Sequence, residues 1–242
     1  MSTERTVGHS PALPITTPAG SALSGTERTA LRRHKERGLQ DRADLYAVLD
    51  AGLVCHLGVL IDGVPVVLPT GYGRDGDLLY LHGSSANRGL LAADGQEVCV
   101  TVTHLDGIVC ARAVFSHSMN YRSAVVFGTA RLVTGDAERL HGLRVITENL
   151  VPGRWAAVRP PTRKEMAATA VLAVPLAEAS VKVRSGPPGD DPDDYALDVW
   201  AGVVPAALTF GPAEPDPALA PGTAVPPHIQ ALARAGDPGP RP

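Results

Sequence analysis

The chain has 242 residues, of which 44% are hydrophobic and 19% charged, and its formal net charge is -3. This length is enough for one sizeable domain or two small ones. Because the charge is near neutral and no long basic run occurs, we expect no nucleic-acid partner. No stretch approaches the roughly 20 apolar residues of a membrane span, and the N-terminus lacks the apolar core of a secretory signal. We therefore expect a soluble, cytoplasmic protein with no membrane partner.

The two ends of the chain differ in composition from its middle. Residues 1–24 and 211–242 are rich in Pro, Gly and small residues and poor in bulky apolar side chains. Such segments cannot bury enough apolar surface to offset the entropy of ordering them. The composition predicts a flexible N-terminal tail (1–24), one domain (25–210) and a flexible C-terminal tail (211–242).

The domain begins with helical patterns and then changes to strand patterns. Residues 26–37 and 42–50 are predicted as two helices, the second with its apolar residues on one face. Apolar runs at 53–61 and 64–68 flank Asp62-Gly63, a pair that accepts the positive φ angles of a type I′ turn. This pattern predicts a β-hairpin.

The rest of the domain shows strand patterns with few helical ones between them. Asp106-Gly107 is predicted as a turn between two strands, and residues 71–76 are rich in turn formers. Many strands with few helices favour an antiparallel barrel, a mainly β fold with peripheral α-helices. The predicted strands are 77–82, 97–104, 108–115, 124–133, 171–176 and 180–184, and the predicted helices are 85–93, 136–149 and 163–168.

The strand-to-helix connection at residues 78–88 could bind an anion. Gly83 and Ser84 follow the predicted strand, and Arg88 lies one turn inside the predicted helix. Free backbone N–H groups, hydroxyls and a guanidinium would converge there, so a phosphate would fit. The alternative is an ordinary connection in which a serine caps the helix and the arginine is solvated.

The segment Pro69-Thr70-Gly71-Tyr72-Gly73 ends a predicted strand. Its proline and glycines limit side-chain bulk and expose backbone polar groups. Such a ribbon can lie against a flat heterocycle and form hydrogen bonds with its edge. A plain turn is the alternative.

A polar segment at residues 116–123 comes directly before the apolar strand that starts at Ala124. Polar and aromatic groups positioned by a rigid strand are a common way to build a binding site. A purely structural loop is an equal alternative.

Histidines and cysteines show no metal-binding spacing, so we expect no metal site. The chain contains no GxSxG elbow, no GxGxxG after a strand and no GxxxxGK[ST] loop. These absences argue against a serine hydrolase, a dinucleotide-binding fingerprint and a nucleoside triphosphatase. The scattered residues are His56, His82, His104, His117, His141, Cys55, Cys99 and Cys110.

Taken in order, these segments resemble a known family. The hairpin is followed by PTGY (69–72), LYLHGSSANR (79–88), SHSMNYRSAVVFG (116–128), PGRW (152–155) and ASVKVR (179–184). This order is similar to the flavin-nucleotide-binding branch of the pyridoxamine-5′-phosphate-oxidase-like superfamily, which includes nitroimidazole-resistance-type proteins. The likeness covers about residues 25–210.

The resemblance implies a six-stranded FMN-binding split β-barrel that forms a homodimer, with two FMN molecules in grooves built from both protomers. In that arrangement the strand at 69–72 lies along the isoalloxazine ring, and residues from 82 to 88 approach the phosphate. The cofactor-binding residues implied are Pro69, Thr70, Gly71, Tyr72, His82, Gly83, Ser84, Asn87, Arg88, Tyr121, Arg122, Ser123, Val125, Lys182 and Trp200.

One departure from the family limits the activity. The oxidase itself holds its phosphorylated substrate with arginines near the C-terminus, whereas this chain has DVWAGVVP at residues 198–205. Oxidation of vitamin B6 compounds is therefore disfavoured.

The function expected is that of an FMN-dependent oxidoreductase. It would take electrons from a nicotinamide or other donor and pass them to a small organic acceptor such as a nitro compound. The alternative is a flavin-binding protein that stores or senses FMN without turnover. Members of this superfamily also bind a deazaflavin or haem, and haem would recruit a histidine as an axial ligand. No catalytic residue is assigned; Tyr121 and His82 are candidates for proton delivery.

Overall fold

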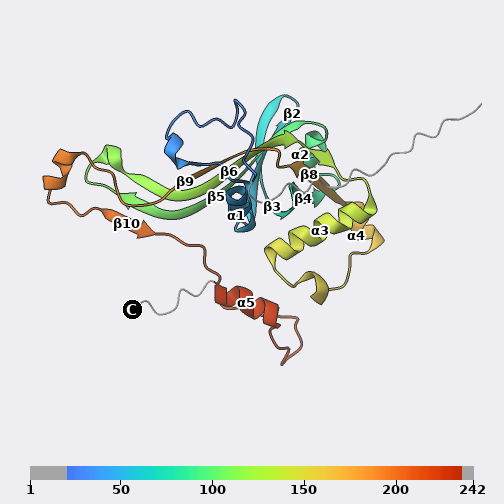
Figure 1. The fold of residues 1–242 in the computed structure, drawn as a ribbon. Coiled ribbons are helices and arrows are strands. Elements are labelled where there is room, and N and C mark those ends of the chain that lie inside the picture. The colour runs from blue at the N-terminus through green and yellow to red at the C-terminus, as the bar shows by residue number, and fades with distance from the viewer. Residues whose placement is uncertain (1–20, 236–242) are drawn as a thin grey trace, which may run out of the picture.

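The computed structural model describes residues 21–235, which form a curved antiparallel sheet with helices packed around it (Figure 1). The ten-stranded sheet has the order β1-β9-β6-β5-β2-β3-β4-β8-β7, and β10 pairs with β5 beside this path. Strand β3 pairs with β2 up to Gly71 and with β4 from Tyr72 onwards, so the barrel is split at this point. The mainly β split-barrel fold expected from the sequence is confirmed.

The elements have the following bounds. The strands are β1 (Gly38–Leu39), β2 (Val54–Ile61), β3 (Val64–Asp75), β4 (Leu78–Ser84), β5 (Glu97–Cys110), β6 (Ser118–Thr129), β7 (Arg131–Leu132), β8 (Thr169–Pro175), β9 (Glu178–Arg184) and β10 (Gly202–Pro205). The α-helices are α1 (Arg42–Asp50), α2 (Arg88–Ala93), α3 (Asp136–Leu150), α4 (Arg163–Ala168) and α5 (Pro227–Ala235). Short 3-10 helices are η1 (Lys35–Arg37), η2 (Val114–Ser116), η3 (Trp155–Ala157) and η4 (Pro192–Ala196).

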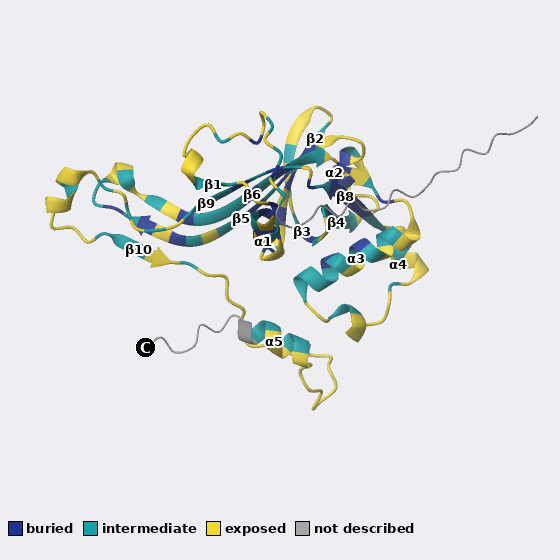
Figure 2. Ribbon diagram, viewed as in Figure 1, coloured by how far each residue is buried: buried dark blue, intermediate teal, exposed yellow. Residues whose placement is uncertain are grey.

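An apolar cluster fills the inside of the curved sheet. Alternate residues of β2, β5 and β6 point into it, and Leu57, Val100 and Val126 are fully buried there. Helix α1 packs against the cluster through Leu45 and Leu49. The buried positions gather around α1 and its neighbouring strands in Figure 2. The predicted second helix and its apolar face are confirmed.

The hairpin between β2 and β3 has the predicted turn. Asp62 has φ 53° and Gly63 has φ 78°. Positive φ at both central residues defines a type I′ turn, whose twist matches that of the flanking strands. The turn sets the register of the hairpin, in which Leu57 lies opposite Leu68.

Two predicted turns are wrong, because the chain continues as strand through both. Strand β3 runs to Asp75, so residues 71–76 are mostly strand rather than turn. Strand β5 is continuous across Asp106-Gly107, where the register with β6 shifts between Leu105 and Gly107. A pair that suits a tight turn also suits a bulge, and pairing on both sides of β5 favours the bulge.

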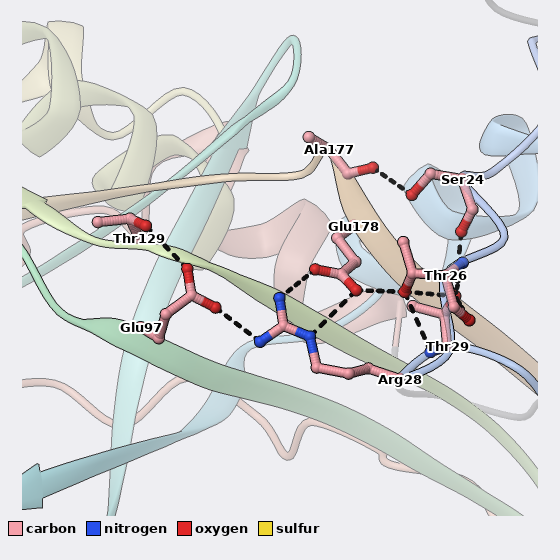
Figure 3. Close-up of polar contacts among 8 residues, drawn as sticks. All are labelled: Ser24, Thr26, Arg28, Thr29, Glu97, Thr129, Ala177 and Glu178. Atoms are coloured by element: carbon pink, nitrogen blue, oxygen red, sulfur yellow. Dashed lines mark hydrogen bonds and ion pairs between the residues drawn. The ribbon is translucent and has the colours of Figure 1, made fainter.

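The helix predicted at 26–37 is wrong, apart from the single 3-10 turn η1. The segment is instead held to the barrel by polar side chains, as Figure 3 shows. Arg28 forms ion pairs with Glu97 of β5 and Glu178 of β9. The Ser24 hydroxyl donates to the Ala177 carbonyl at 2.7 Å, and Thr26 donates to Glu178. These tertiary contacts outweigh the local helical preference of the sequence.

Replacing Arg28 by alanine should release the segment at 22–31 from the barrel. Hydrogen bonds from Arg28 lower the pKa of Glu97 and of Glu178 below the ordinary value of 4.5. The contact therefore stabilises above that pH and weakens as the pH falls through the lowered pKa values. Protection of residues 22–31 against amide hydrogen exchange, corrected for the intrinsic exchange rate at each pH, should be lost in the variant at pH 7. In the parent protein it should be lost only below the lowered pKa values of Glu97 and Glu178. Arg163→Ala, on exposed α4, is the control, and equal exchange in Arg28→Ala would contradict this role.

Beyond the core, β5 and β6 extend into an arm, defined as residues 105–122 together with residues 185–205 (Figure 1). Strand β10 adds to the arm by pairing with the end of β5, Gly202 opposite Cys110. Arg112 and Asp190 join the two parts through an ion pair of 2.9 Å, and the Arg112 backbone N–H also donates to Asp190. These contacts fix the segment after β9 to the end of β5.

The two ends of the described chain contain structure that composition did not predict. Leu23 is buried, and its N–H donates to the Gln40 carbonyl at 2.7 Å. Helix α5 lies within the segment expected to be a flexible tail. Residues 1–20 and 236–242 of the two predicted tails lie outside the described residues. In the described part of the chain, no helix has the length and apolar character needed to cross a membrane.

Candidate functional site

The outer face of the sheet, defined as the side of β9, β6, β5, β2 and β3 that points away from the core, brings together several predicted site residues. Along one row Val125 pairs with Thr101, which pairs with His56, which pairs with Pro69. Three strand spacings, about 14 Å, separate Val125 from Pro69. Lys182 and Ser123 lie opposite each other in the next row, and Tyr121 is one row further along β6.

Polar groups on the outer face are available to a ligand. Within residues 21–235 the Lys182 ammonium, the Tyr121 hydroxyl and the His56 imidazole form no hydrogen bond or ion pair with the protein. The Ser123 hydroxyl makes only a long bond of 3.3 Å to the Lys182 carbonyl. The face is thus a pleated surface with unpaired donors, and Pro69 and Gly71 beside them add little or no side-chain bulk.

Helix α2 lies close to β3 and β4 and brings two of the predicted segments together. A Cβ atom on Gly83 of β4 would lie 2.7 Å from Leu90, and one on Gly89 would lie 2.2 Å from Leu68 of β3. Both glycines therefore allow the helix to approach the strands on either side. The segment predicted to bind phosphate and the strand at 69–72 meet beside this helix.

The first turn of α2 carries the predicted polar residues. Asn87 caps the helix by accepting hydrogen bonds from the Gly89 and Leu90 N–H groups. Arg88 pairs with Asp62 of the hairpin turn at 2.9 Å, and the two side chains are 77% and 82% exposed. Such an exposed pair contributes little stability. The Arg88 guanidinium can therefore exchange Asp62 for an anionic ligand.

His82, near the end of β4, is a half-buried histidine without a visible partner. Its Nδ1 is buried and has no hydrogen-bond partner within the described residues. Burial lowers the pKa of His82, so the imidazole is neutral at pH 7. A buried polar atom without a partner costs free energy. Such an atom is a candidate contact for a bound ligand beside Gly83 and Ser84.

Four predicted residues belong neither to the group on the outer face nor to the group at β4 and α2. Tyr72 is fully buried in the core, where its hydroxyl donates to the Leu49 carbonyl and burial raises its pKa. Thr70 lies on the same side of β3 as Tyr72. Arg122 makes a two-pronged ion pair with Asp106, at 3.0 and 2.8 Å. Trp200 lies on the arm beside Gly202, roughly 20 Å along β5 from the Thr103 row.

A hollow of about 710 Å³ lies where the ends of α1 and α3 meet β5 and the C-terminal segment. Sequence reasoning missed it, except for Arg122. Its wall comes from segments far apart in the chain, so no local pattern could have indicated it. The lining includes Leu53, Val102, His104, Leu150, Leu208, Phe210 and Leu232.

Comparison with known proteins identifies the family. The model of the family described as pyridoxamine 5′-phosphate oxidase matches residues 41–183, more than half of the chain. The chain belongs to this family. The match runs from the start of α1 to the end of β9, so it covers the split barrel and the outer face.

Two solved structures share much of the sequence. The flavocytochrome Anf3 from Azotobacter vinelandii is 42% identical, with a TM-score of 0.82, over 86% of this chain and 97% of that one. The FAD and heme binding protein from Mycobacterium smegmatis is 39% identical, with a TM-score of 0.78, over 81% and 97%. Strand β9 ends at Arg184, and residues 1–184 are a smaller part of the chain than the 86% and 81% that the two matches cover. Both likenesses therefore extend into the segment after β9.

A third structure shows the fold alone. A 5-nitroimidazole antibiotic resistance protein from Bacteroides thetaiotaomicron is 22% identical, with a TM-score of 0.52, over 60% of this chain and 86% of that one. A comparison with curated proteins gave no match. Among residues 21–235 there is also no group of three or more metal-ligating side chains.

Proposed function

We propose that the protein binds a flavin nucleotide on the outer face of the sheet and acts as a redox protein. The observation that carries this proposal is the set of unpaired Lys182, Tyr121 and His56 side chains on a face that also presents Pro69 and Gly71. A flavin offers a flat ring for the pleated surface and a phosphate for a cation. The likeness to a flavocytochrome over most of the chain supports the same proposal.

Each part of the site would have a separate role in holding the flavin. Pro69 and Gly71 leave room for the ring to lie against the strand, because neither places a large side chain on the face. Either Arg88, beside the hairpin turn, or Lys182, on the far side of the outer face, would pair with phosphate, since both guanidinium and ammonium donate charge-assisted hydrogen bonds. The unpaired Nδ1 of His82 would contact the nucleotide at the split.

A bound flavin supplies the hydride and electron chemistry. The chain would orient the ring and leave one side accessible to a nicotinamide donor and a small organic acceptor such as a nitro compound. Tyr121 and neutral His82 are the candidates for holding or delivering a proton. Because the flavin carries the chemistry, no side chain needs to act as a nucleophile.

The nucleotide we propose is FAD, with FMN as the alternative that the sequence predicts. The Mycobacterium smegmatis relative, named for FAD and heme, supports this choice. For the same reason we propose that the protein also binds haem, which supplies one-electron chemistry. A flavin-storage or sensing role without turnover is the second candidate.

The purified protein should show flavin absorbance and, after reconstitution with haemin where needed, a Soret band. Acid release followed by chromatography should identify FAD and not FMN. The flavin should bleach with a reduced nicotinamide and recover with an electron acceptor. A protein that keeps its flavin but does not react with any donor would favour storage, and one that binds neither FAD nor FMN would contradict the proposal.

Whichever of Lys182→Ala and Arg88→Ala removes the partner of the phosphate should weaken flavin binding about tenfold or more, because a hydrogen bond to a charged group contributes about 1.5–3 kcal/mol. Fluorescence titration of the flavin-free protein measures the change. Lys164→Ala, an exposed lysine of α4, is the control for loss of one positive charge. Unchanged affinity in both variants would place the phosphate elsewhere.

We also propose that the protein is a homodimer joined through the outer face. This face exposes apolar side chains around the polar row, among them Val54, Leu60 and Leu105, and Val67 is 64% exposed. An exposed apolar patch of this kind marks an interface. In a dimer the second copy would cover the flavin and exclude water from its ring.

Val67→Glu should convert the dimer into monomers, because a buried unpaired carboxylate at the interface costs several kcal/mol. Size-exclusion chromatography with light scattering measures the mass. Leu219→Glu changes an exposed apolar residue outside the outer face and should leave the dimer intact. A Val67→Glu dimer as stable as the parent would exclude this face as the interface.

A further inference from the structure

The end of the arm exposes large apolar side chains to solvent. Val114 and Phe115 of η2 are each 93% exposed. Across the neighbouring strands, Met119 of β6 pairs with Ile108 of β5, which pairs with Val204 of β10, and all three are exposed. Single exposed apolar side chains are common on protein surfaces, whereas a contiguous apolar row of this kind is a candidate binding surface. Its shape suits a flat, largely apolar ligand.

His117 lies between these groups, directly after η2 and two residues before Met119. Its Nδ1 is 2.9 Å from the Ala113 carbonyl and can donate a hydrogen bond to it. This bond fixes the tautomer and the ring orientation and leaves the Nε2 lone pair free. A histidine that binds a metal usually has its other ring nitrogen held in this way.

Among the other histidines of the described chain, only His34 also has its Nδ1 engaged. In His104 and His141 it is Nε2 that is engaged, by the Val48 carbonyl and by Asp75 respectively. Ring nitrogens of His82 and His228 are buried without partners. His34 has its Nδ1 near Glu36, but it lies in a strongly basic segment without an apolar row. His56 has no hydrogen bond to orient its ring.

The arm also contains the part of the chain that distinguishes this protein from a plain split barrel. Strand β10 belongs to the segment after β9, into which the likeness to the flavocytochrome and to the FAD and heme binding protein extends. By pairing with β5, it contributes Val204 to the apolar row. The segment after β9, part of which these two relatives share, therefore helps to build the surface beside His117.

We propose that His117 is an axial ligand of the haem iron and that the Met119–Ile108–Val204 row lies against the haem. This inference rests on the proposed haem binding. The flat apolar row would bury one side of the ring, while Val114 and Phe115 would cover its edge. The Ala113 carbonyl would keep Nε2 directed at the iron and increase its basicity.

The test compares the spectrum and haem content of His117→Ala with those of the full-length parent, both supplied with haemin. The parent should show the Soret band of a histidine-bound haem. In His117→Ala haemin binding should weaken about tenfold or more, and the residual band should shift. Added imidazole should restore the parent spectrum in the variant. His34→Ala, which removes the other histidine with an engaged Nδ1, should leave the spectrum unchanged.

Flavin content distinguishes loss of the ligand from loss of the fold, because His117 is not among the residues proposed to hold the flavin. His117→Ala should keep its flavin and its circular dichroism. A variant with the parent's Soret band, haem content and affinity would overturn the assignment of His117 while leaving haem binding intact. A parent protein with no Soret band after haemin addition would overturn haem binding itself.

Discussion

The antiparallel pairing of β5 with β6 is the constraint on which both the core and the proposed site depend. In β5, Val98, Val100 and Val102 point into the core, while Thr101 and Thr103 point to the outer face. Because side chains alternate with a period of two, one register sets both faces at once. A slip of one residue would expose the valines and bury the polar row. The packing of the core therefore also positions the proposed flavin site.

The split in the barrel gives the second half of that site. Strand β3 changes partner between Gly71 and Tyr72, and α2 lies close to both β3 and β4. Gly83 and Gly89 allow the helix to lie close to both strands. As a result Arg88 lies beside the hairpin, and His82 lies at the open end of β4. The change of strand partner in β3 thus places these polar groups next to the pleated surface of the sheet.

The arm connects the two proposed cofactor sites through one rigid element. Ser123, on the outer face, and Ser118, next to His117, are five residues apart on β6, about 17 Å. The arm is held by backbone pairing on both sides of β5 and by the Arg112–Asp190 ion pair. With both cofactors bound, their separation would be set by strand geometry rather than by a flexible loop. This is a suitable arrangement for electron transfer between two fixed centres.

The sequence by itself determined the features that depend on neighbouring residues. The Asp62-Gly63 turn, helices α1 and α4 and the strands of the barrel followed from local patterns, because turn angles and alternating burial are properties of short segments. The family resemblance also predicted that Pro69, Ser123 and Lys182, which come from three separate motifs, belong to one cofactor site. Only the tertiary structure decided that residues 26–31 hold to the barrel through Arg28, that Asp106-Gly107 is a bulge and that Tyr72 belongs to the core. In each case the deciding partner lies far away in the chain, and a local pattern carries no information about it.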